Sequence, residues 1–331
     1  MNLFDTTTAV LTDPPREAAI LHSAAAILEA YIQPLIVVLG VVGNVISFRI
    51  LSLPSYKHQS TCIYMKAMAF SDSMYLCCYV FQRTFMSIYN HEIRSSDNFK
   101  WICIQFLFWA YFGGLSSSII LQTMSLDRLF ALLFPLKAKS WCSVNKARIF
   151  VGCMFLVLMV ILLPLNLSRV YQPRLIGWLC PFHFENDMAA SYDHFISIVG
   201  TYIPLVIIFI SNVGIVVVLK MSEQRRQEMT SDRNSSSNNQ VVRMLLVVSL
   251  TFLVLKLPVK IRNAFWTYYT GTNTPQIVAL RRFTVTLSEV VEYCNFAFNT
   301  YIYILPVKKF REDAKTVCCC GDARTESTVS K

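Results

Sequence analysis

The sequence predicts an all-α membrane protein in which seven transmembrane helices form one bundle and a short amphipathic helix follows the seventh span. Of its 331 residues 54% are hydrophobic and only 15% are charged, with a mean hydropathy of +0.47, whereas a soluble domain carries roughly 25% charged residues. The apolar residues form seven stretches long enough to cross a bilayer. Most of the basic residues lie on one side of these stretches. Soluble, disordered, collagen-like and small disulfide-rich chains are therefore excluded.

A helix that crosses the hydrocarbon core needs about 20 mostly apolar residues. The seven stretches that qualify are 26–51, 61–89, 101–134, 147–167, 195–219, 241–269 and 283–305. The middle parts of the fourth and fifth contain no charged residue, whereas the seventh contains Glu289 and Glu292. We expect residues 1–25 to be an extracellular N-terminal tail, 26–305 the seven-transmembrane domain, and 306–331 the amphipathic helix and cytoplasmic tail.

The orientation follows from the basic residues. With the N-terminus outside, most of the 30 Lys and Arg residues face the cytoplasm, and the net charge of +10 lies mainly on that face. A basic chain is also typical of a nucleic-acid-binding protein, but an excess confined to loops between apolar spans is better explained by topology. We expect a multi-pass protein of the plasma membrane with no nucleic-acid partner. The glycosylation sequon at Asn166 would lie at the outer end of the fourth span.

Cysteines on the two sides of the membrane have different expected roles. Cys103 begins the third span at its outer end and Cys180 lies in the outer loop after the fourth, so both face the oxidising side and we predict a disulfide, with two free thiols as the alternative. Cys318, Cys319 and Cys320 follow the basic amphipathic stretch VKKFREDAKTV on the reducing side. They are candidates for palmitoylation; a metal site is the weaker alternative because no histidine is near.

One acidic residue lies in the middle of the second span. A carboxylate in the low-dielectric interior is costly unless it has partners, so Asp72 is a functional candidate by default. We expect Asn44, Ser117, Asn295 and Asn299 to face it from the other spans. A purely structural polar network is the alternative.

Four further charges lie in the last two spans. Lys256 and Lys260 are four residues apart on one helix face, and Glu289 and Glu292 are three apart on the next helix. Because buried charges require partners, we predict that one of the two lysines pairs with one of the two glutamates at the floor of a ligand cavity. The alternative is that these side chains face water in a wide cavity.

Several different short motifs follow one another along the chain, one in each of several spans. They are GNV with Asn44, AFSDS with Asp72, DRLFALLFPL from Asp127, FLVLKLP ending at Pro258, and NTYIY ending at Tyr303. Together these motifs resemble those of the rhodopsin-like, class A, G-protein-coupled receptors, and the resemblance covers nearly the whole chain. Five features depart from the family pattern. Leu129 replaces a Tyr, Thr300 replaces a Pro, and Lys256 replaces the Trp of the sixth-span motif; Asn212 stands where a Tyr is frequent, and the fourth span has no Trp.

The resemblance implies a receptor that transmits binding of an extracellular ligand to a heterotrimeric G protein, with arrestin and a receptor kinase as further partners. The residues that it implicates in activation and coupling are Asp127, Arg128, Pro258, Asn299 and Tyr303. It also implies a sodium ion in the resting state, held at Asn44, Asp72, Ser117, Asn295 and Asn299. No enzymatic activity and no cofactor are expected, because the five histidines are scattered and form no triad or metal pair.

The ligand class is narrowed by two substitutions. Ala110 stands where amine receptors of this family carry an Asp, and Tyr293 stands where opsins carry the Schiff-base Lys. A mixed aromatic and polar rim suits a short peptide. The candidate ligand-binding residues are Gln105, Trp109, Lys256, Lys260, Asn263, Trp266, Glu289, Glu292 and Tyr293. The run FPLKAKSWCSVNKAR resembles invertebrate neuropeptide receptors of the FMRFamide-receptor-like group. We predict a neuropeptide receptor, with a chemosensory receptor for small molecules or lipids, or a membrane transporter or channel, as alternatives.

Overall fold

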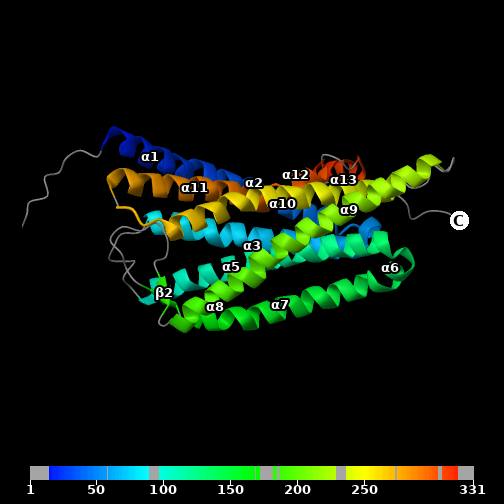
Figure 1. Ribbon diagram of the computed structural model, residues 1–331, viewed down its shortest axis with the longest axis horizontal. Coiled ribbons are helices and arrows are strands. Elements are labelled where there is room, and N and C mark those ends of the chain that lie inside the picture. The colour runs from blue at the N-terminus through cyan, green and yellow to red at the C-terminus, as the bar shows by residue number, and fades with distance from the viewer. Residues whose placement is uncertain are drawn as a thin grey trace, which may run out of the picture.

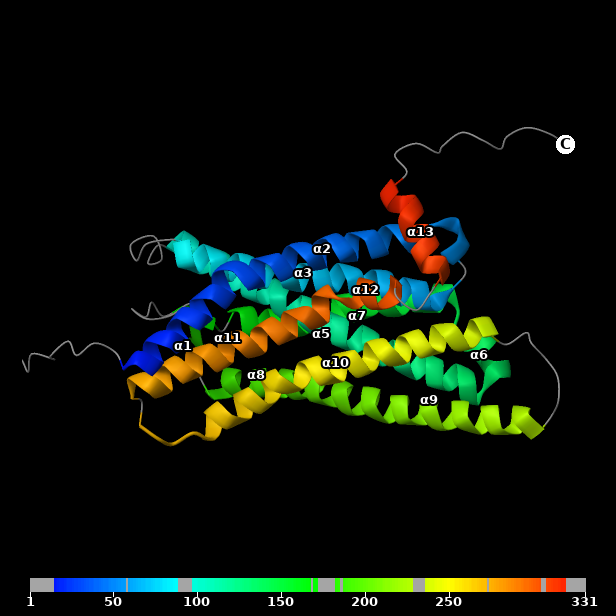
Figure 2. The same ribbon diagram turned by 90° about the horizontal axis from the view of Figure 1, so that it is seen from above.

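The computed structural model describes residues 15–57, 59–88, 97–167, 169–171, 182–184, 187–228, 236–272, 274–304 and 308–319. Seven long helical segments lie side by side in an elongated bundle (Figures 1 and 2). The end of the bundle next to α6 and α13 is called the inner end below, and the opposite end the outer end. The seven-helix architecture predicted from the sequence is confirmed.

The seven segments are built from ten helices and two π-helical turns. The first is α1 (Arg16–Ile27), η1 (Leu28–Ile32) and α2 (Gln33–Ile50); the next three are α3 (Ser60–Ile88), α5 (Asp97–Leu133) and α7 (Val144–Leu167). The fifth is α8 (Asp187–Ser197), η3 (Ile198–Tyr202) and α9 (Ile203–Glu228); the last two are α10 (Ser236–Tyr268) and α11 (Pro275–Ala297) with α12 (Asn299–Ile304). Shorter helices at the inner end are η2 (Pro54–Tyr56), α6 (Pro135–Trp141) and α13 (Lys308–Cys319).

Three of the seven segments begin eight or more residues earlier than hydropathy predicts, and one of them is the fifth, which begins at Asp187 and not at residue 195. The first begins at Arg16, not at residue 26, and the seventh begins at Pro275, not at residue 283. Hydropathy marks only the apolar part of a helix, whereas capping decides where the helix starts. At α11 the Thr274 side chain accepts a hydrogen bond from the backbone N–H of Ile277, and Pro275 occupies the first turn.

A short β ladder adds to the all-α prediction. Strand β1 (Arg169–Tyr171) pairs antiparallel with β2 (Phe182–Phe184), with Arg169 opposite Phe184. The ladder lies at the outer end, next to α8 (Figure 1).

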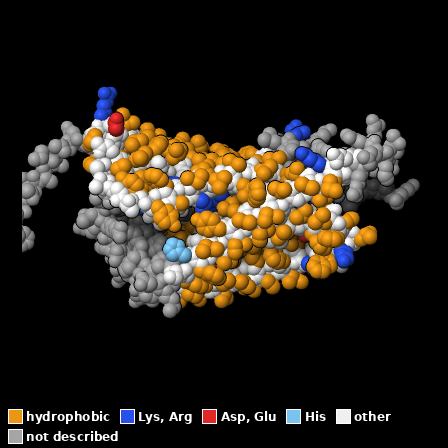
Figure 3. Space-filling view, viewed as in Figure 1, with side chains coloured by type: hydrophobic (Ala, Val, Ile, Leu, Met, Phe, Trp, Pro, Cys, Tyr) orange, Lys and Arg blue, Asp and Glu red, His pale blue; other side chains and the backbone are white. Residues whose placement is uncertain are grey.

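The surface between the two ends is apolar. Hydrophobic side chains cover the middle of the molecule, and most of the visible charged side chains lie toward its ends (Figure 3). Four described helical segments are long and apolar enough to cross a membrane by length and composition: 16–50, 104–133, 144–164 and 194–222. The other three long segments, α3, α10 and α11, carry Asp72, Lys256, Lys260, Glu289 and Glu292.

Small residues allow close helix packing at two places. A Cβ atom at Gly113 on α5 would lie 2.7 Å from the carbonyl oxygen of Ser71 on α3. A Cβ atom at Gly40 on α2 would lie 2.6 Å from Leu76 of α3 and 2.7 Å from Ala297 of α11. Small residues let helix backbones approach closely in membranes, so these contacts set the distance of α3 from its neighbours, and with it the position of Asp72.

Both π-helical turns directly precede a proline. Gln33 N–H bonds the carbonyl of Leu28 just before Pro34, and Ile203 N–H bonds the carbonyl of Ile198 just before Pro204. Proline lacks an N–H and its ring crowds the preceding turn, which a wider π turn relieves. The helices α7 and α10 continue through Pro164 and Pro258.

The predicted amphipathic helix is present as α13. It runs across the direction of the bundle helices at the inner end (Figure 2). Phe310 and Ala314, four residues apart, are buried, whereas Arg311, Glu312 and Lys315 are not. Tyr56 Oη donates a hydrogen bond of 2.7 Å to Asp313 Oδ2, which ties α13 to the first inner loop.

Candidate functional site

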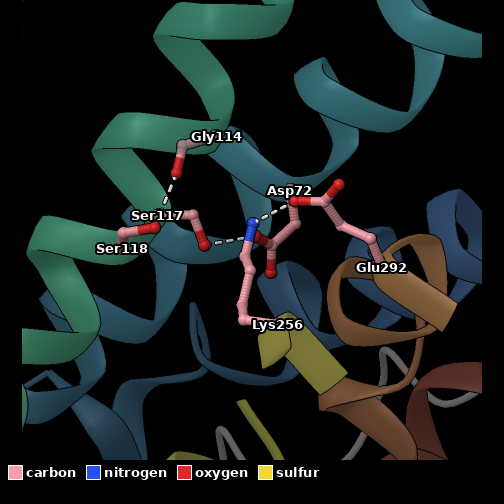
Figure 4. Close-up of polar contacts among 6 residues, drawn as sticks. All are labelled: Asp72, Gly114, Ser117, Ser118, Lys256 and Glu292. Carbon is pink, nitrogen blue, oxygen red and sulfur yellow. Dashed lines mark hydrogen bonds and ion pairs between the residues drawn. The ribbon is translucent and has the colours of Figure 1, made fainter. Parts of the chain in front are cut away.

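The centre of the bundle is a buried carboxylate held from two neighbouring segments. Asp72 on α3 has no exposed surface. Ser117 Oγ on α5 donates to Asp72 Oδ1 at 2.5 Å (Figure 4), and Asn299 Nδ2 on α12 donates to Asp72 Oδ2 at 2.7 Å. Two of the four predicted partners are therefore confirmed, and Asp72 links the second, third and seventh segments.

The other two predicted partners lie nearby but make different contacts. Asn44 Nδ2 donates to the carbonyl oxygen of Phe296 at 3.1 Å. Asn295 is buried on α11. Within the described residues neither side chain hydrogen-bonds Asp72, so the expectation for these two contacts is wrong.

The seventh segment breaks without the proline usual at this position. Phe298, with φ −98° and ψ 2°, separates α11 from α12. Two residues later, Thr300 Oγ1 accepts a 2.7 Å hydrogen bond from Ser47 Oγ of α2. Thr300 thus ties the inner part of the seventh segment to the first.

The predicted lysine–glutamate pair is present. Lys256 Nζ on α10 lies 2.6 Å from Glu292 Oε1 on α11, and the two side chains are only 6% and 14% exposed. The Lys256 ammonium also lies 4.4 Å from the centre of the Phe296 ring and 5.8 Å from those of Tyr75 and Phe252. An ammonium group that is removed from water is stable only beside a carboxylate or aromatic rings. Glu292 and the three rings supply these partners to Lys256.

The other two charges of the predicted set lie on the same two helices, α10 and α11. Lys260, one helical turn from Lys256, has its Nζ 5.2 Å from the centre of the Tyr202 ring of η3. Glu289 is buried on α11. Lys256 thus pairs with Glu292, and Lys260 faces the fifth segment.

Further toward the outer end, an aromatic cluster joins α10 to α11. Trp266 Nε1 donates to Thr284 Oγ1 at 3.1 Å, and the Arg281 guanidinium lies 5.7 Å from the Trp266 ring centre. Asn263, on the same helix, is exposed.

The remaining candidates for ligand contact differ in exposure. Gln105 and Trp109 on α5 are half-buried, and Trp109 packs edge-on against Phe108 and Phe112, with ring centres 5.2 and 5.9 Å apart. Tyr293 is fully buried, and its ring centre lies 6.3 Å from that of Tyr75. The predicted rim therefore includes residues of the core.

A second ion pair at the outer end was missed by sequence reasoning. Arg282 of α11 donates to Glu29 Oε2 of η1 at 2.9 Å, and Thr286 Oγ1 donates to Glu29 Oε1 at 2.7 Å. His22 Nδ1 of α1 lies 3.3 Å from the other end of the same guanidinium. The position of Glu29 inside the first predicted span, where an acid requires a partner, is the signal that would have found it.

At the inner end, Asp127 and Arg128 are half-buried in the last turns of α5. Arg128 Nε is buried and has no hydrogen-bond partner within the described residues, and neither side chain forms an ion pair among them. The Cys142 thiol lies 3.9 Å from the backbone carbonyl oxygen of Asp127. Burial, followed by the interaction with the Asp127 side chain, raises the pKa of Cys142 to about 12.

Several predicted sites lie outside the described residues. Cys180 and Cys320 fall in undescribed segments, and the side chains of Cys103, Asn166, Tyr303, Cys318 and Cys319 are not described. In the described part of the chain, no cluster of His, Cys, Asp or Glu has the arrangement of a metal site.

Comparison with known proteins agrees with this arrangement. Residues 43–303 match the family described as 7 transmembrane receptor (rhodopsin family). The chain is 24% identical over 300 residues to somatostatin receptor type 5 of Rattus norvegicus, covering 89% of this chain and 79% of that receptor. It is 25% identical over 310 residues to the neuromedin U receptor homolog nmur-2 of Caenorhabditis elegans, covering 83% and 75%. The chain therefore belongs to the rhodopsin family of G-protein-coupled receptors; it is a multi-pass membrane receptor and not an enzyme.

Proposed function

We propose that this receptor converts the binding of an extracellular neuropeptide into activation of a heterotrimeric G protein. The observation that carries the ligand class is the similarity, over most of the chain, to receptors named for somatostatin and neuromedin U. The resemblance of FPLKAKSWCSVNKAR to invertebrate FMRFamide-receptor-like receptors narrows the proposal to that group.

The outer half of the bundle supports a peptide over a small apolar ligand. Arg281 and Trp266 form a cation–π contact at the outer ends of α10 and α11, and Lys260 forms another with Tyr202 deeper in the bundle. A peptide offers carboxylates, amides and aromatic rings that such side chains recognise. Gln105, Asn263, Glu289 and Tyr293 belong to the same proposed binding region.

Activation would be a population shift between two arrangements of the helices. Lys256 and Glu292 join α10 to α11, and Asp72 joins α3 to α5 and α12. A ligand that competes for Glu292 would weaken the link to α10 and favour its outward movement about Pro258. Arg128, whose Nε has no partner within the described residues, would then be available to the G protein.

The remaining sites complete the proposal. Activation also involves Asp127, Asn299 and Tyr303. The outer disulfide joins Cys103 to Cys180. The receptor lies in the plasma membrane with its N-terminus outside. Arrestin and a receptor kinase act on the inner face. The modified side chains are Asn166 by glycosylation and Cys318, Cys319 and Cys320 by palmitoylation.

The test is a screen of the expressed receptor against amidated neuropeptides, with calcium and cyclic-nucleotide readouts. We expect a peptide to give a saturable response that is lost in Arg128→Ala at equal surface expression, while binding of the same labelled peptide persists. A response only to volatile or lipid compounds would assign the receptor to chemosensation. Substrate flux without guanine-nucleotide exchange would indicate a transporter or channel and contradict the proposal.

A further inference from the structure

We infer that the Lys256 ammonium is the built-in cation of the Asp72 network, and that the receptor therefore takes no sodium ion there. This property belongs to the resting bundle and is independent of the ligand class. The family resemblance implies a sodium ion at Asp72. The residues around Asp72 in this chain do not fit that ion.

Each carboxylate oxygen of Asp72 already accepts one hydrogen bond from the chain. Hard cations bind several oxygen ligands in proteins, carboxylates foremost. Both carboxylate oxygens of Asp72 accept short hydrogen bonds, from Ser117 and from Asn299. Asn44, expected at the same site, instead directs its amide to the carbonyl of Phe296.

The positive charge that a buried carboxylate needs is supplied by the chain itself. Lys256 extends from α10 to Glu292, and Figure 4 shows its Nζ directed toward the region where Glu292 and Asp72 converge. The Lys256 charge interacts electrostatically with Asp72 as well as with Glu292. A sodium ion at Asp72 would meet this fixed ammonium as a like charge.

The charges of this region balance without an ion from solution. Asp72, Glu289 and Glu292 are three acids of this region, and Lys256, Lys260 and Arg262 on α10 are three bases. Lys260 also interacts with the Glu292 charge. A sodium ion at Asp72 would thus add a positive charge beside Lys256, the base that acts on the Asp72 charge.

The surroundings of the ammonium suit an organic cation. Three rings approach Lys256 Nζ, with that of Phe296 centred at 4.4 Å and those of Tyr75 and Phe252 at 5.8 Å. Aromatic faces attract a desolvated ammonium. The rings of Tyr75 and Phe296 stack with centres 3.9 Å apart, and this contact holds both rings in place beside the Lys256 ammonium.

The experiment compares the unfolding temperature of the purified full-length receptor in sodium chloride and in choline chloride at equal ionic strength. We expect the same unfolding temperature for the wild type in both salts. The variant Lys256→Met removes the ammonium but keeps an unbranched side chain. We expect sodium to raise the unfolding temperature of this variant by about 2–4 °C when the sodium concentration is about ten times the dissociation constant for sodium. Adding Asp72→Asn to this variant should abolish the gain.

Lys260→Met is the matched control, because it removes a lysine on the same helix face that contacts Tyr202; it should remain insensitive to sodium. Stabilisation of the wild type by sodium that Asp72→Asn abolishes would overturn the inference. So would a folded Lys256→Met variant without any sodium dependence. If Lys256→Met cannot be purified, basal guanine-nucleotide exchange is measured in wild-type membranes in the two salts. Equal exchange rates support the inference. A lower exchange rate in sodium overturns it if the Asp72→Asn variant no longer shows the difference.

Discussion

The pair formed by Lys256 and Glu292 makes a quantitative prediction. At the observed 2.6 Å the attraction between the two charges is about 6 kcal/mol with an effective dielectric constant of about 20, and desolvation offsets much of it. Removing one partner leaves the other buried and uncompensated. We therefore expect Lys256→Met and Glu292→Gln each to lower the stability by about 3–5 kcal/mol.

The double variant Lys256→Met/Glu292→Gln removes both charges and should be more stable than either single variant. The assay is a double-mutant cycle on thermal unfolding in detergent, with surface expression in cells as the second readout. The reversed pair Lys256→Glu/Glu292→Lys should recover part of the expression lost by each reversal alone. Lys260→Met serves as the comparison. Lys260 acts on the Glu292 charge more weakly than Lys256 does, so its coupling to Glu292→Gln should be smaller. If the effects of the Lys256 and Glu292 variants add to within about 0.5 kcal/mol, the pair is not coupled and the reasoning is wrong.

Three further predictions concern the packing and the inner end. Gly40→Ala should destabilise the receptor by about 1–3 kcal/mol, because its new Cβ has no room, whereas Gly152→Ala, whose Cβ would meet nothing within 4 Å, should not; thermal unfolding of both tests this. Burial and then the hydrogen bond to Asp313 raise the pKa of Tyr56 above its ordinary 10.0, so its contribution to stability is complete below pH 10 and declines as the pH rises further. Tyr56→Phe should cost about 1 kcal/mol at neutral pH and remove that alkaline decline; an unchanged decline in pH-dependent unfolding would contradict this. The raised pKa of Cys142 should slow its alkylation at pH 8 by on the order of a thousandfold relative to a thiol of pKa 9.0, measured by mass spectrometry; equal rates in folded and denatured receptor would contradict it.

The sequence contains enough to predict the helices and the buried pair, because both follow from the cost of placing polar groups in an apolar medium. Seven apolar stretches require seven helices, and a buried lysine requires an acid. Which acid is used depends on the rotation of α10 against α11. Since both glutamates lie on one face of α11, the sequence leaves Glu289 and Glu292 as equivalent choices.

The contacts of Asn44 illustrate what the sequence does not reveal. Asn44 faces the bundle interior as predicted, but the end of α11 at Ala297 leaves carbonyl groups of its last turn without helical partners. The carbonyl of Phe296 is one of these, and Asn44 satisfies it. That helix end falls at Phe298 without a proline to mark it, so the competition between Asp72 and this carbonyl is visible only in three dimensions.

The two π turns affect how this receptor is compared with its relatives. Each wide turn accommodates one more residue than a regular helical turn, which in evolution corresponds to the insertion of a single codon. Suppose residues outward of Pro34 and Pro204 are matched to those of a relative that lacks the π turn by counting from a shared motif. Each matched residue would then point about 100° away around the helix from its true equivalent. Tyr202 lies within such a turn. Equivalent ligand contacts on the first and fifth segments should therefore be matched by superposition in space, with a one-residue gap permitted at each turn.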